Sequence, residues 1–129
     1  MEYHRFIVLR RISHAAVLIF IILAAMAAVL AGFGALGFIP FMVLLAAIMF
    51  LLGLIFANFN SLAMEPQAKM AGTASSVFGS ITTLIASVLG TAVGQAYDGT
   101  LVPLTSAYLL FGIATLAAIL VAERGRLFG

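Results

Sequence analysis

The sequence predicts an all-α membrane protein with four transmembrane helices, arranged as an antiparallel up-down bundle with both termini cytoplasmic. Three observations predict this fold: the composition, four long uncharged stretches, and the placement of the cations. Of the 129 residues, 65% are hydrophobic and only 8% are charged. A soluble domain has about 45–50% apolar and about 25% charged residues. A chain this short cannot bury so much apolar surface in one aqueous core, so lipid must surround most side chains.

The predicted spans cover residues 12–33, 38–62, 70–96 and 101–122 of one membrane domain, 1–129. Each supplies the ~20 residues that a helix needs to cross about 30 Å of hydrocarbon. The alternating segments of about 10 residues that are typical of transmembrane strands do not occur. Because the backbone must satisfy its own hydrogen bonds in lipid, the spans are expected to be helices.

Short polar or glycine-rich segments connect the spans. Glycines between 32 and 37 separate the first two, and Pro40 suits the first turn of the second helix. The second connection is 65–69, and the third is the turn at 97–100. Connections this short make neighbouring helices antiparallel. A cleaved signal peptide at the N-terminus is the less favoured alternative, because the first apolar run exceeds the usual 7–15 residues.

The positions of the cations predict the orientation. Antiparallel threading brings all six to one side of the membrane, whereas the loops around Gly34 and Asp98 on the other side carry none. The positive-inside rule then places both termini in the cytoplasm. The expected location is a bacterial-type inner (plasma) membrane. The six cations are Arg5, Arg10, Arg11, Lys69, Arg124 and Arg126.

The third span has two different faces when its residues are placed at 100° intervals. Bulky residues such as Val77, Leu84 and Val88 occupy one face. The opposite face is small and weakly polar, which lets helices approach closely in lipid. Two uses remain open: static packing in the bundle, or sliding against another domain. This predicted packing face comprises Gly72, Ser76, Gly79, Ser80, Thr83, Ala86, Ser87, Gly90 and Gly94.

The first and fourth spans are almost uniformly apolar, which predicts peripheral, lipid-contacting helices. The second span becomes polar at its cytoplasmic end, with Asn58, Asn60 and Ser61. These residues, with Gln95 at the opposite surface, are candidates for lining a transport pathway or gate. Helix capping and surface contact are the alternative roles. At about 1.5 Å per residue, Asn58 lies near the membrane boundary rather than the midplane.

No pattern indicates an enzyme, a cofactor or a bound metal. Cysteine is absent, and the glycine-rich stretches lack the Lys-Ser/Thr ending of a P-loop. His4 and His14 have no partner at the spacing of metal ligands and are interpreted as interfacial side chains. The net charge of +2 is too small to indicate nucleic-acid binding. The interiors of the spans carry no ionisable residue that would serve as a proton carrier.

Four ordered motifs resemble a known family. The segments 58–66 (NFNSLAMEP), 71–76 (AGTASS) and 94–100 (GQAYDGT, followed by Pro103-Leu104), with the tail 123–127 (ERGRL), resemble the C-terminal end of the Bcr/CflA drug-resistance branch of the major facilitator superfamily. The resemblance covers essentially the whole chain. The sequence departs from the family pattern at Ala57, where a proline is common, and at 67–69, where a Gly-His pair is common.

The resemblance implies a partial major-facilitator fold in which the four spans correspond to helices nine to twelve of twelve. It implies a fragment of a proton-coupled exporter of small drug-like or metabolite substrates. The lipid bilayer and either the missing N-terminal helices or another copy are then the expected partners, and the chain is not expected to transport alone. Two alternatives remain: a small self-assembling four-helix exporter, and a non-transporting membrane assembly partner.

Overall fold

The structure is a computed structural model that describes residues 2–125, and the secondary structure of this part of the chain is entirely helical. The first helix begins well before the predicted span at residue 12. The charged residues that precede the apolar stretch are therefore helical as well. The elements are α1 (Glu2–Gly32), α2 (Phe38–Met64), the 3₁₀ helix η1 (Glu65–Met70), α3 (Ala71–Gln95) and α4 (Val102–Ala122).

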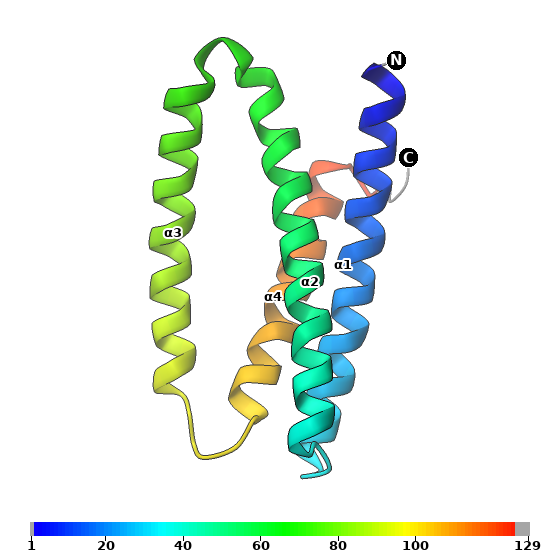
Figure 1. Cartoon of the computed structure of the whole chain (residues 1–129), viewed down its shortest axis with the longest axis vertical. Coiled ribbons are helices and arrows are strands. Elements are labelled where there is room, and N and C mark those ends of the chain that lie inside the picture. Colours follow the sequence, from blue (N-terminus) through cyan, green and yellow to red (C-terminus); the bar gives the residue numbers. More distant parts are fainter. Residues whose placement is uncertain (1, 126–129) are drawn as a thin grey trace.

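Three continuous helical segments in the described residues are long and apolar enough to cross a membrane: Tyr3–Gly32, Phe38–Gln95 and Val102–Ala122. The middle segment turns back on itself at η1 (Figure 1). Gln67 leaves the helical region there, with φ −102° and ψ 17°. Pro66 lies in the first turn of η1, where its missing N–H costs no helical hydrogen bond. Helices α2 and α3 therefore form an antiparallel hairpin.

Helices α1, α2 and α4 form a bundle in which α1 packs against both of the others (Figure 1). The core of this bundle joins Ala16, Phe20 and Ala24 of α1 to Ile48 and Leu51 of α2. Alanines on α1 let the neighbouring backbones come close, which is the main source of helix association where lipid is the solvent.

The contact between α1 and α4 depends on a glycine. A Cβ atom at Gly112 would lie 2.9 Å from ring carbons of Phe20 and 2.9 Å from Cγ1 of Ile21. Tyr108, one turn earlier on α4, meets Phe20 edge-on, with ring centroids 6.4 Å apart at 88°. The Phe20 ring thus fits into the space that Gly112 leaves open, and this fixes where the two helices cross.

The central position of α1 differs from the peripheral position that its composition predicted. Residues such as Ile22 and Val29 are exposed, at 65% and 56%, but the other side of α1 carries Val17, Phe20 and Ala24 in the core. Uniformly apolar helices do not show by periodicity which side packs, since lipid and protein core suit the same side chains.

Helix α3 stands apart from this bundle (Figure 1). It makes few contacts with α2 and α4, and none of its residues is buried. It is tied to the rest of the chain mainly through η1 at one end and the segment 96–101 at the other.

The charged ends of the helices gather at one end of the molecule. The start of α1, η1 and the end of α4 point to that end, whereas the turns at Gly34 and Asp98 lie at the other (Figure 1). Both turns use a glycine in the left-handed region, Gly34 with φ 65° and Gly99 with φ 88°. Arg126, one of the six cations, lies outside the described residues.

Candidate functional site

The four predicted pathway residues do not meet in the structure. Asn58, Asn60 and Ser61 lie in the last turns of α2, and Gln95 ends α3 at the opposite end of the molecule. Asn58 and Asn60 are half-buried, whereas Ser61 and Gln95 are exposed. These residues therefore form two separate groups rather than one site, and their role as a gate stays a prediction.

Asn58 is the most distinctive member of this set. Its Nδ2 amide is buried and has no hydrogen-bond partner among the described residues. Leaving a buried amide donor unpaired costs about 1–3 kcal/mol. One helical turn later, the Ser61 hydroxyl donates to the Ala57 carbonyl at 2.9 Å and so satisfies itself locally. The Asn58 amide thus carries a cost that no hydrogen bond among the described residues offsets.

Most of the predicted packing face of α3 is not covered by another helix of the chain, and Gly90 and Gly94 line the space between α3 and α4. Its residues are exposed, apart from the half-buried Gly79. A Cβ atom added at Gly72, Gly79, Gly90 or Gly94 would meet no atom within 4 Å. A shallow groove of about 650 Å³ runs along this face between Ser75 and Ser87. The small residues that would permit close packing therefore lie uncovered.

Three of the four hydroxyl groups on this face are satisfied by the helix itself. Ser76 donates to the Gly72 carbonyl at 2.9 Å, Ser80 to Ser76 at 2.8 Å, and Ser87 to Thr83 at 2.8 Å. This back-bonding removes the cost of placing hydroxyls in lipid. The Thr83 hydroxyl on the same face has no hydrogen bond among the described residues. Because the helix itself satisfies the serine hydroxyls, the face suits a helix neighbour better than a charged ligand.

An apolar cavity of about 500 Å³ separates the last turns of α3 from the first turns of α4. Two tyrosines and Phe111 contribute aromatic surface to it, and no charged residue lines it. Its volume falls in the range of about 300–1,000 Å³ that is typical of small-molecule sites. The sequence did not predict this cavity, because it depends on how far α3 stands from α4. The lining residues are Gly90, Val93, Gly94, Tyr97, Pro103, Leu104, Ala107, Tyr108 and Phe111.

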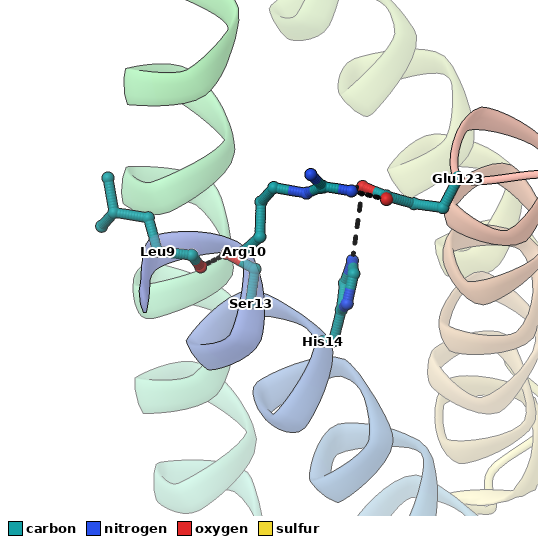
Figure 2. A network of polar contacts seen from close by, with 5 residues as sticks. All are labelled: Leu9, Arg10, Ser13, His14 and Glu123. Atoms are coloured by element: carbon teal, nitrogen blue, oxygen red, sulfur yellow. Dashed lines mark hydrogen bonds and ion pairs between the residues drawn. The ribbon is translucent and has the colours of Figure 1, made fainter. Parts of the chain in front are cut away.

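A polar cluster joins α1 to the end of α4 (Figure 2). Arg10 forms an ion pair with Glu123 and donates from Nε to Oε1 at 2.9 Å. Nε2 of His14 lies 3.8 Å from the same oxygen. The His14 side chain is only 2% exposed and that of Glu123 17%, whereas Arg10 is 39% exposed. A charged contact this sheltered is screened less than a surface pair, so it pins the two helices together.

The sequence did not predict that His14 lies close to Glu123. Glu123 is far from it in sequence, and only the crossing of α1 and α4 brings the two side chains together. The one local signal was the spacing of Arg10 and His14, four residues apart on one helix face. His4, the other histidine, is exposed.

The described residues contain no group of three or more His, Cys, Asp and Glu side chains that would hold a metal ion. Comparison with protein-family models found no match, and searches of curated proteins and of solved structures found none either. Function must therefore be argued from the residues and their arrangement.

Proposed function

We propose that this chain crosses the membrane four times with both ends cytoplasmic, and that it supplies the C-terminal helices of a larger drug or metabolite exporter. In this proposal it corresponds to helices nine to twelve of a major facilitator of the Bcr/CflA branch, and transport is driven by proton exchange. Its α3 helix packs against helices that this chain does not itself contribute, and the chain alone does not transport.

The distribution of charge supports the orientation. Five cations, one from η1 and the others from the start of α1 and the end of α4, gather toward one end of the described structure. The turns at the opposite end carry no Lys or Arg. Under the positive-inside rule the cationic end stays in the cytoplasm. Reporter proteins fused to either terminus should both be cytoplasmic, and a terminus found outside would contradict the proposal. The five cations are Arg5, Arg10, Arg11, Lys69 and Arg124.

The uncovered small face of α3 is the observation that carries the proposal. Glycines at 72, 79, 90 and 94 serve no close approach within the chain. Small residues of this kind mark helix interfaces in membranes. A transporter half that moves against its partner needs such a face, because bulky interdigitated side chains would lock it. The apolar cavity beside α3 adds a space of suitable size for a drug-like molecule.

Cysteine cross-linking tests the packing of α3. The chain has no cysteine, so Ser80→Cys places a single thiol on the small face and Ile113→Cys places one on the exposed side of α4. In native membranes, Ser80→Cys should cross-link to a transporter helix that mass spectrometry identifies, whereas Ile113→Cys should not. Capture of a second copy instead would favour the small self-assembling exporter. Equal cross-linking of Ser80→Cys and Ile113→Cys would show that the small face of α3 is no more an interface than the exposed side of α4.

A transport assay tests the second part of the proposal. The purified chain in liposomes should show no proton-driven movement of a fluorescent cationic dye. Gradient-driven dye transport by this chain alone would overturn the proposal that it depends on other helices. Stable co-purification with a transporter that works without it would favour the assembly-partner alternative.

A further inference from the structure

A second, more polar cavity lies where α1 and α2 diverge toward the cationic end of the molecule (Figure 1). Its volume is about 240 Å³. Arg5, Phe6 and Leu9 of α1 line one side, and Ser61 of α2 and Glu65 of η1 line the other. The cavity therefore combines one cation, one carboxylate and one hydroxyl with two apolar side chains.

The charged groups of this cavity are not paired within the described structure. Among the side chains of residues 3–125, the ion pairs join Glu123 to Arg10 and His14, and they do not include Arg5 or Glu65. The Ser61 hydroxyl donates to the Ala57 carbonyl, so its oxygen can still accept a hydrogen bond. The cavity thus offers a guanidinium donor on one wall, and carboxylate and hydroxyl acceptors on the other.

Size and position narrow the class of ligand. At about 240 Å³ the cavity is smaller than the roughly 300–1,000 Å³ of drug-sized sites, so a compact polar group suits it better. It lies among the cations that the proposed topology places at the cytoplasmic surface, which is the depth of lipid headgroups. Phe6 and Leu9 continue the cavity with apolar surface, as the glycerol and acyl ends of a lipid would require.

We propose that this cavity binds the headgroup of phosphatidylethanolamine. Arg5 takes the phosphate, since a guanidinium fork matches phosphate oxygens in pairs. The carboxylate of Glu65 and the oxygen of Ser61 accept hydrogen bonds from the primary ammonium. A phosphatidylcholine headgroup carries the same charges, but its methylated nitrogen has no N–H to donate. The proposal rests on the membrane placement proposed above and is independent of whether the chain takes part in transport.

Native mass spectrometry of the full, delipidated chain tests the proposal. Phosphatidylethanolamine should bind roughly threefold to tenfold more tightly than phosphatidylcholine of the same acyl chains, as the net contribution of one solvent-accessible hydrogen bond implies. Glu65→Gln should remove this preference, and Arg5→Gln should weaken binding of both lipids. Lys69→Gln at the same end, which does not line the cavity, and Asp98→Asn at the other end should change neither. Arg5→Lys, which keeps the charge, should retain part of the binding.

Several results would overturn the proposal. They are equal binding of the two lipids by the unmodified chain, a preference that survives Glu65→Gln, or stronger binding of anionic phosphatidylglycerol, which would indicate a general basic surface. Soluble phosphoethanolamine should compete only weakly, because it lacks the acyl chains; competition as strong as that of the lipid would contradict a membrane source. Circular dichroism checks that each variant is helical, and the lipid preference of the unmodified chain tests the proposal even where a variant misfolds. None of these results depends on dye transport.

Discussion

Helices α1 and α3 are both long enough to span a membrane, yet the rest of the chain packs on one and leaves the other uncovered. Helix α1 carries Val17, Phe20 and Ala24 in the core, whereas none of the residues of α3 is buried. The helix whose sequence showed no packing face is the centre of the bundle. The helix with a clear small face has no neighbour for that face within the chain.

This difference shows that the apolarity of a helix does not decide which helices pack together where lipid is the solvent. Shape complementarity does, because lipid tails satisfy apolar side chains as well as protein does. Phe20 of α1 fits over Gly112 of α4, and this fit orders the bundle. The glycines of α3 have no such counterpart in the chain. Close packing on this face of α3 would therefore need a helix from another molecule.

The largest effect is expected from filling the space at Gly112. Gly112→Leu forces side-chain atoms into the Phe20 ring, so α4 must move away from α1. Overpacking of this kind typically costs about 1–3 kcal/mol, and a change from glycine to leucine lies at the upper end. Thermal unfolding in detergent, followed by circular dichroism, measures the loss.

Gly79→Leu on α3 is the matched control for this substitution. A Cβ atom at Gly79 meets nothing within 4 Å, so the unfolding free energy of the monomeric chain should not fall, and the better helix propensity of leucine should raise it by up to about 1 kcal/mol. A loss equal to that of Gly112→Leu would show that α3 packs as tightly as α1, and would contradict the difference between the two helices.

A smaller loss is expected from Glu123→Gln, which removes the carboxylate that Arg10 and His14 share (Figure 2). Breaking a fully buried ion pair costs about 3–5 kcal/mol. Because Arg10 is 39% exposed, water partly replaces the lost contact, and a loss at the lower end of about 1–3 kcal/mol is expected. Thermal unfolding of Glu123→Gln, Arg10→Gln and the double variant isolates the coupling between the two side chains. Additive effects of the single changes would contradict a pairing that holds α1 to α4.

The smallest effect concerns Asp98, in the turn that connects α3 to the bundle. Hydrogen bonds from the side chain and backbone of Thr100 lower the pKa of the Asp98 carboxyl from its ordinary value of 3.8. Because the folded pKa is depressed, this contribution to stability is complete above the ordinary pKa. It is lost as the pH falls through the lower folded pKa.

Unfolding of the unmodified chain measured from pH 5 to pH 2 should therefore show a slight acid-dependent loss that Thr100→Ala reduces. Asp98 is fully exposed, so the change should be near the limit of detection. An acid-dependent loss of the same size in Thr100→Ala would show that the hydrogen bond from the Thr100 hydroxyl does not contribute to it.

Much of the local structure could be predicted from residue order. The apolar stretches, the glycine turns at Gly34 and Gly99 and the proline at Pro66 are local features, and local backbone chemistry acts on each of them directly. The polar end of α2 was also visible in sequence, because Asn58 and Asn60 interrupt an otherwise apolar helix. The cluster of Arg10, His14 and Glu123 was not, since its members approach only when α1 and α4 cross.

Composition and residue order by themselves determined that this chain is helical, apolar enough to enter lipid, and charged at one set of helix ends. Only the tertiary structure decided that α1 is central, that α3 stands apart, and that Glu123 meets Arg10 and His14. The physical reason is that backbone hydrogen bonding and burial in lipid act on each helix separately. The choice of neighbour depends on the fit between surfaces such as Phe20 and Gly112, which residue order alone does not reveal.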